Sequence, residues 1–171
     1  LTGVEISSTN SECVVKFTNT GTNTWSPPIG TDTIRSLIVG GGGGGGYHVG
    51  SGGGGGGVID TFIEVNPSSD YEVAVGSGGS GGSLDDPGCS NNDVSNTNSC
   101  GHPSNSTLQT NGGNSVFGSI TAIGGGRGGS WNYISPSSGG SGGGSSYGGG
   151  NYFATGRLIT SGAGQGTTQD G

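Results

Sequence analysis

The stretch TIRSLIVGGGGGGG, residues 33–46, decides the fold of this chain. Its first half is rich in β-branched residues and predicts a strand, residues 33–39. Seven glycines, residues 40–46, follow that strand without a break. The same junction appears in reverse where six glycines, residues 52–57, run into VIDTFIEV, residues 58–65. We infer that strand and glycine run belong to one ordered unit.

Two further strands end in glycine runs. YEVAV, residues 71–75, continues into GSGGSGG, and ITAI, residues 120–123, continues into GGGRGG. Glycine and serine together usually make a flexible linker. The alternative is a polyproline-II-like geometry with three residues per turn, in which backbone groups bond to neighbouring segments. Because glycine loses more backbone entropy on ordering than any other residue, only several runs paired together could be ordered. We predict such packed segments of polyglycine-II type.

The composition excludes several classes of protein. Glycine makes up 45 of the 171 residues, methionine is absent and only four residues are Lys or Arg. Residues that favour helices are scarce, which argues against a helical protein. No stretch has the length of about 20 apolar residues that a membrane span needs. The net charge of −7 argues against nucleic acid as a partner. We therefore predict an all-β fold without an α-helix.

The order of the blocks resembles a known family. The matching blocks are W-SPP-IGT from Trp25, IRSLIVGGGGGGG, GGGGGGVIDTFIEVNPSSDYEVAVGSGGSGG and GGNSVFGSITAIGGGRGG. This pattern is similar to the glycine-rich domain of bacterial surface proteins and phage tail fibres. It resembles more distantly the glycine-rich ectodomain of the anaplastic lymphoma kinase family. Polyglycine bundles also occur in snow-flea antifreeze proteins and in some phage adhesin tips. The resemblance implies a β-sandwich or jelly-roll-like scaffold and an extracellular or virion location, without implying an activity.

The chain divides into three parts. Residues 1–24 have strand patterns without glycine runs and form an N-terminal arm, and residues 25–160 form the glycine-rich β domain. A polar disulfide loop, residues 83–112, lies inside that domain, and residues 161–171 form a polar tail that we expect to be flexible. Threonine at every second position of residues 18–24 predicts one strand with a threonine face.

The cysteines point to an oxidising compartment. Cys89 and Cys100 flank a polar loop, and a disulfide between them would supply what packing cannot. Cys13 is left over, either buried in a strand or bridged to another chain. Asn105 begins an N-glycosylation sequon on the same polar loop. Together these features favour an extracellular location.

Chemistry-bearing residues are few. His48 and His102 are the only histidines, and no nucleophile elbow or phosphate loop is present. We expect no enzyme activity, no cofactor and no metal. A zinc site would lack ligands, because it needs four of them. The oxygen-rich stretch 85–93 could bind calcium, but we interpret it as a solvated turn.

Three functions remain. The first is a structural subunit of an extracellular filament that polymerises with itself, in which the N-terminal arm completes a neighbour's sheet. The inserted residues would be Val4, Ile6, Val14 and Phe17. The alternative is that residues 1–24 pair within their own sheet. The second is a tail-fibre or surface adhesin domain that binds a receptor or surface glycans; its contact residues would be Tyr47, His48, Trp131 and Tyr133. The third is ice binding through the threonine row. We favour the filament subunit.

Overall fold

The computed structural model describes residues 3–9, 12–47, 50–83, 108–130 and 135–145. All regular elements among them are strands: β1 Val4–Ser8, β2 Cys13–Phe17, β3 Gly21–Trp25, β4 Thr33–Val39, β5 Val58–Glu64, β6 Tyr71–Val75, β7 Ser115–Phe117 and β8 Ile120–Ala122. The predicted all-β fold is confirmed for this part of the chain. No helix among the described residues is long and apolar enough to cross a membrane.

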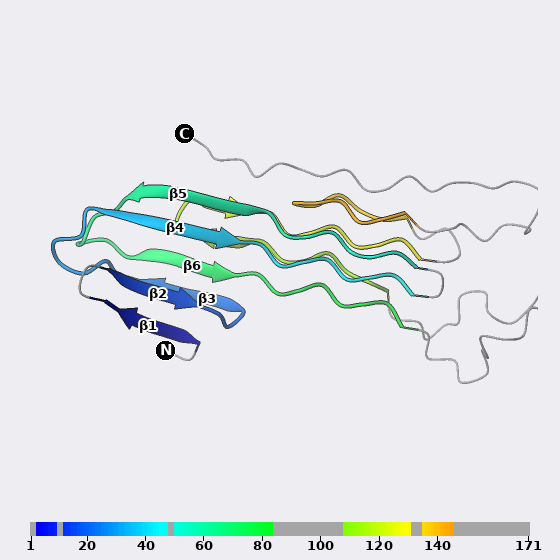
Figure 1. The fold of residues 1–171 in the computed structure, drawn as a ribbon, viewed down its shortest axis with the longest axis horizontal. Helices are drawn as coiled ribbons and strands as arrows, with labels where there is room; N and C mark the ends of the chain where they lie inside the picture. Colours follow the sequence, from blue (N-terminus) through cyan, green and yellow to red (C-terminus); the bar gives the residue numbers. More distant parts are fainter. Residues whose placement is uncertain (1–2, 10–11, 48–49, 84–107, 131–134, 146–171) are drawn as a thin grey trace, which may run out of the picture.

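The strands form antiparallel sheets at one end of an elongated molecule (Figure 1). The back sheet has the order β3-β6-β7-β8. In front of it, β4 pairs with β5 and β1 pairs with β2, as two separate two-stranded sheets. From this end, glycine-rich segments run side by side to the far end of the molecule (Figure 1). The predicted sandwich with packed glycine segments is thus the observed architecture.

Alternating residues of the strands supply a small core between the sheets. Ile38 of β4 and Ile59 of β5 pack in one cluster with residues of the back sheet, namely Val73, Phe117 and Ala122. The ring of Tyr71 stacks on Phe117 at 5.5 Å between centroids, and Trp25 lies 5.9 Å from the same ring. This aromatic group closes the core on the side of β3. Such tilted and stacked pairs add to the stabilisation that burial gives.

The predicted threonine strand over residues 18–24 is wrong. β2 ends at Phe17, the chain bends at residues 19 and 20, and β3 begins only at Gly21. Gly21 has φ of 122°, a value that side-chain-bearing residues rarely adopt, and this conformation allows the turn. Only Thr22 and Thr24 therefore share a strand face. The row of four threonines that suggested ice binding is therefore not present on one strand.

β3 falls within the N-terminal arm predicted for residues 1–24 and is part of the back sheet. β3 pairs with β6 in full register, from Gly21 opposite Val75 to Trp25 opposite Tyr71. The described arm consists of β1 and β2, which pair with each other from Val4 opposite Phe17 to Ser8 opposite Cys13. A short connection, closed by the Thr9 N–H that donates to the Glu12 carbonyl at 2.8 Å, joins the two strands.

Candidate functional site: a glycine bundle and a strand slot

The segment 123–129 is the axis of the glycine bundle. Each of its carbonyls accepts a hydrogen bond; the donors are, in chain order, the N–H groups of Gly57, Gly140, Gly112, Gly54 and Ser137, the side-chain amide of Gln109 and the N–H of Ser51. The N–H groups of residues 124–129 donate, in order, to Asn114 Oδ1, Gly41 O, Ser141 O, Asn111 Oδ1, Gly44 O and Gly144 O. The same neighbouring segment returns at every third residue. This is the period of the polyproline-II helix, and it confirms the predicted geometry.

A second row of bonds joins the outer segments. Gly40, Gly43 and Gly46 donate to Gly57, Gly54 and Ser51 at 2.9, 2.8 and 2.8 Å, so the runs 40–46 and 51–57 are antiparallel. The N–H groups of Gly79 and Gly82 donate to Gly42 and Gly45, which places the run 76–82 parallel to 40–46. The glycine runs are thus held by lateral backbone pairing.

The period of three also decides where side chains are tolerated. A Cβ on Gly43 would collide with the carbonyl of Gly126, whereas a Cβ on Gly42 would meet nothing closer than 3.8 Å. Positions 40, 41, 43, 44 and 46 are all blocked by backbone atoms. Ser77 and Ser80 lie at exposed positions of the outer run. The three-residue spacing of these serines is the sequence signal that could have predicted which face of the run is exposed.

The far end of the bundle buries three polar residues. Gln109 is 1% exposed, and its Nε2 donates to the Gly128 carbonyl at 2.7 Å. The Tyr47 N–H donates to Ser130 Oγ at 3.0 Å. Within the described residues, the Tyr47 hydroxyl and Gln109 Oε1 are buried without a hydrogen-bond partner. Gln109 therefore stands in for a backbone donor where the glycine segment has ended.

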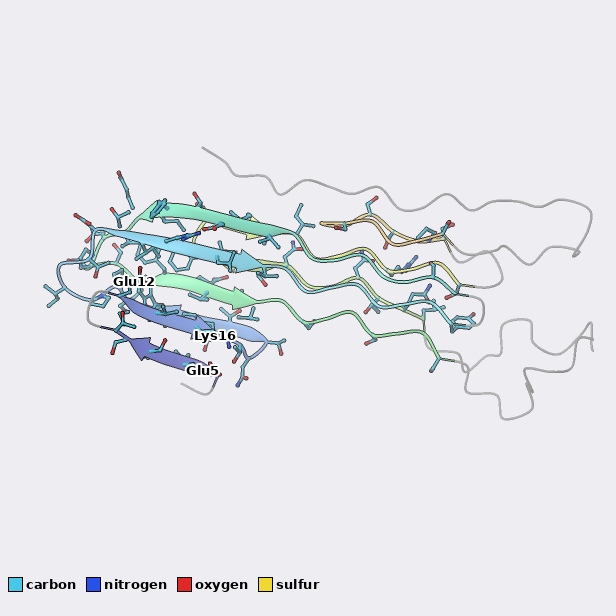
Figure 2. The ribbon with its side chains drawn as sticks, viewed as in Figure 1. Glu5, Glu12 and Lys16 are labelled. Atoms are coloured by element: carbon cyan, nitrogen blue, oxygen red, sulfur yellow. The ribbon has the colours of Figure 1, made fainter. Side chains whose placement is uncertain are left out.

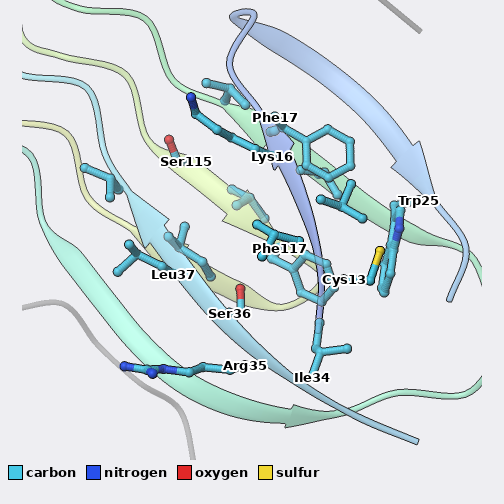
Figure 3. A pocket seen from close by; sticks show the side chains of 18 residues that line it. Cys13, Lys16, Phe17, Trp25, Ile34, Arg35, Ser36, Leu37, Ser115 and Phe117 are labelled. Atoms are coloured by element: carbon cyan, nitrogen blue, oxygen red, sulfur yellow. The ribbon is translucent and has the colours of Figure 1, made fainter. Parts of the chain in front are cut away.

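A groove opens at the other end, between the two parts of the front layer (Figure 3). Its walls are β2 and β4, which do not pair with each other. Its floor consists of β6 and β7 residues, including Val73, Val116 and Phe117. The groove has a volume of about 570 Å³ and is lined mainly by apolar side chains. We call it the strand slot, because β2 and β4 each present a strand edge to it.

Two cationic side chains stand on the walls of the strand slot. Lys16 of β2 pairs with Glu5 of β1 at 3.3 Å. Arg35 of β4 donates through Nε and Nη2 to the two carboxylate oxygens of Asp60, at 3.0 and 2.8 Å. These hydrogen bonds lower the pKa of Asp60 and raise that of Arg35. Both pairs are largely exposed, so they contribute little to stability.

The structure places the predicted arm residues in one hairpin, whose Glu5, Glu12 and Lys16 are marked in Figure 2. Val4 and Ile6 lie in β1, and Val14 and Phe17 lie in β2. Ile6 is 71% exposed and Val14 is 53% exposed, whereas Phe17 packs against the core. Their role between subunits stays a prediction.

The remaining predicted site residues are mostly outside the described part. Tyr47 is buried, so its ring is not displayed on the surface, as a contact role would require. Six of them lie outside the described residues, namely His48, Cys89, Cys100, Asn105, Trp131 and Tyr133. The predicted disulfide and glycan therefore stay predictions.

Cys13 is an exposed free thiol on the wall of the strand slot. Among the described residues, no group of three or more His, Cys, Asp or Glu side chains could hold a metal ion.

The model of one protein family, described as a glycine-rich domain, matches residues 18–171. The chain belongs to the glycine-rich domain family. No curated protein and no solved structure matches it. The family match begins directly after Phe17, so the β1–β2 hairpin precedes the matched glycine-rich domain.

The strand slot is the feature that sequence reasoning missed. Its walls come from β2 and β4, and its floor comes from strands that are far away in the sequence. The β2 pattern CVVKF and the β4 pattern TIRSLIV look like ordinary strands. Nothing in either pattern indicates that one edge of the strand lacks a neighbour among the described strands, since pairing is decided by the assembled sheet.

Proposed function

We propose that this glycine-rich domain is a structural subunit of a self-assembling extracellular filament, in which the N-terminal strand arm links neighbouring subunits. The strand slot is the observation that carries this proposal. It joins two strand edges that have no pairing partner among the described strands to an apolar floor. An extended segment added to such edges gains main-chain hydrogen bonds and pockets for alternate side chains. A contact of this kind, made head to tail, produces a fibre where the rotation does not close.

Two further features support a structural role. The glycine bundle is a rod whose backbone groups bond laterally, and such a rod keeps its shape without a large core. The arm lies before the matched family domain, where an added linking element would be expected. The extracellular location rests on the sequence, namely the Cys89–Cys100 loop, the sequon at Asn105 and the family resemblance.

The test is the assembly state of the full chain at increasing concentration, measured by electron microscopy and analytical ultracentrifugation. The variant Ile6→Asp places a charge on the exposed apolar face of the arm, and Ile29→Asp places the same charge at a 99% exposed position outside it. We expect filaments from the unmodified chain and from Ile29→Asp, and loss of filaments with Ile6→Asp. A chain that stays monomeric, or an Ile6→Asp variant that polymerises normally, would contradict the proposal.

A phage tail-fibre or cell-surface adhesin domain is the second candidate. It is favoured by the far end of the bundle, where several described segments end close together: the Tyr47 N–H donates to Ser130 Oγ, the Gly82 N–H donates to the Gly45 carbonyl, and Gln109 Nε2 donates to the Gly128 carbonyl. Several connections at one end of a rigid support are a common arrangement for recognition loops. Binding of the monomer to bacterial surfaces or glycans would favour this function over the filament.

A further inference from the structure

The strand slot has the form of a missing strand in the front layer. β1-β2 and β4-β5 lie in that layer as two separate sheets, and the back sheet crosses behind the space between them (Figure 1). β2 and β4 both run toward the glycine bundle in this view. One strand placed between them would be antiparallel to both and could pair along both of its edges.

We propose that the strand slot is filled by β1 of a second copy of this chain. This inference rests on the filament function proposed above and adds the acceptor site and its occupant. The completed front layer would have the order β2–β1–β4–β5, with the second copy supplying β1. It would then face a back sheet of the same number of strands, β3-β6-β7-β8.

The side-chain pattern of β1 fits the slot. Val4 and Ile6 alternate with Glu5 and Ser7, so one face is apolar and the other is polar. In its own hairpin, β1 leaves Ile6 71% exposed. In the slot, the apolar face would lie over the floor formed by the back sheet. Its five residues match the five residues of β2.

Charge complementarity favours β1 over the other end of the chain. With Val4 and Ile6 turned inward, Glu5 would point outward beside Lys16, which loses the Glu5 of its own chain when β1 is donated, while Arg35 on the other wall keeps its pair with Asp60. The C-terminal stretch YFATGRLIT, residues 152–160, offers a glycine in its middle and the cation Arg157. Glycine weakens a strand, and a third cation would meet like charges.

The exchange is also favourable for the donor. Within the part of its own chain that the structure describes, β1 pairs only with β2, in a two-stranded sheet with an exposed Lys16–Glu5 pair. An isolated hairpin of this kind is marginally stable in water. In the slot, β1 would exchange one paired edge for two. Each copy would give one strand and accept one, which yields an open chain of subunits.

The test is disulfide trapping between isotopically distinct copies. All variants carry Cys13→Ser, which removes the native thiol from the slot wall. Ser7→Cys is made in a ¹⁵N-labelled full-length chain, and either Leu37→Cys or Val39→Cys is made in an unlabelled one, since these side chains lie on the outward face of β4. Phe62→Cys, on the outward face of β5 and 74% exposed, is the matched control. Samples are mixed, assembled, oxidised and analysed by mass spectrometry of the cross-linked peptides.

We expect labelled–unlabelled disulfides between positions 7 and 37 or 39, at about tenfold the yield of the Phe62→Cys control, because a disulfide needs Cβ atoms about 4 Å apart. Filaments that give no such product, or a cross-link from Tyr152→Cys to β4 in its place, would overturn the slot assignment while leaving the filament function. A double variant that carries both thiols and cross-links only within one chain would also overturn it. Absence of filaments and of the cross-link would contradict the filament function as well.

Discussion

The two ends of this molecule are held together by opposite means. At the strand end, side chains crowd between the sheets, whereas the glycine segments carry few side chains along their length (Figure 2). The strand end depends on a small core that includes Ile38, Val73 and Phe117. The glycine end depends on backbone groups, all of which find partners along residues 124–129. Absence of side chains can itself be a packing device, since it lets backbones approach each other laterally.

The energetic terms explain why the bundle needs so many segments. Ordering one residue costs about 1–2 kcal/mol of backbone entropy, and more for glycine. A hydrogen bond returns about 1 kcal/mol net. A single glycine run therefore stays unfolded, and the segment 123–129 is ordered because it bonds to several neighbours and is buried among them. At the strand end, burial of apolar side chains adds a favourable free-energy term that the glycine segments lack.

The strand end should be broken by removing a side chain. Phe117→Ala deletes the ring that contacts both Trp25 and Tyr71, and we expect the free energy of unfolding to fall by about 4 kcal/mol. Phe62→Ala, at a 74% exposed position, should change it by less than about 0.5 kcal/mol. Urea denaturation of both variants checks this. Equal effects would mean that the cluster is not the core.

The glycine end should be broken by adding a side chain. Gly43→Ala puts a methyl group into the backbone of Gly126, which is itself fixed by hydrogen bonds, and we expect a loss of about 3 kcal/mol. The neighbouring Gly42→Ala should be neutral or slightly stabilising, because its Cβ has room and alanine restricts the unfolded chain. Thermal unfolding of this adjacent pair is the comparison. Equal tolerance at both positions would contradict the packed bundle.

The fold was largely predictable from the sequence, and the slot was not. The predicted strand over residues 33–39 is observed with those bounds, and the ordered glycine segments are confirmed. Both rest on local patterns, namely β-branched runs and uninterrupted glycine. The threonine strand failed because a turn with positive φ at Gly21 overrode the alternation. The slot depends on which strand edges remain unpaired, and that is a property of the assembled sheets.

We expect the asparagine side chains of the bundle to make an intermediate contribution to the free energy of unfolding. Asn114 Oδ1 accepts the Gly124 N–H at 2.9 Å, and Asn111 plays the same role for Arg127 one turn along. Asn114→Ala removes the acceptor for a buried N–H and should cost about 1–2 kcal/mol. Asn114→Asp keeps a carboxylate oxygen at that place and should recover most of the loss. Chemical denaturation of the two variants separates lost bonding from lost packing.

The smallest effect on stability is expected from the exposed Arg35–Asp60 pair, which joins β4 and β5. Hydrogen bonds from Arg35 lower the pKa of Asp60, so the folded chain binds that proton less readily than the unfolded chain. The resulting stabilisation is present above the ordinary aspartate pKa of about 3.9 and is lost as the pH falls through the lower, folded value. An NMR titration of the Asp60 carboxyl should show this lowered pKa. Arg35→Gln should return it to the ordinary range, whereas Lys16→Gln should leave it unchanged.

Hydrogen exchange of the glycine amides tests most directly whether the bundle is a rigid, laterally bonded element. The amides of Gly43, Gly54, Gly125 and Gly126 donate to backbone carbonyls of neighbouring segments at 2.8–2.9 Å. We predict that they exchange as slowly as the paired amides of β6 at the strand end. Exchange at the rate of a free peptide, with the strand amides still protected, would show that the glycine bundle is not a rigid, laterally bonded element.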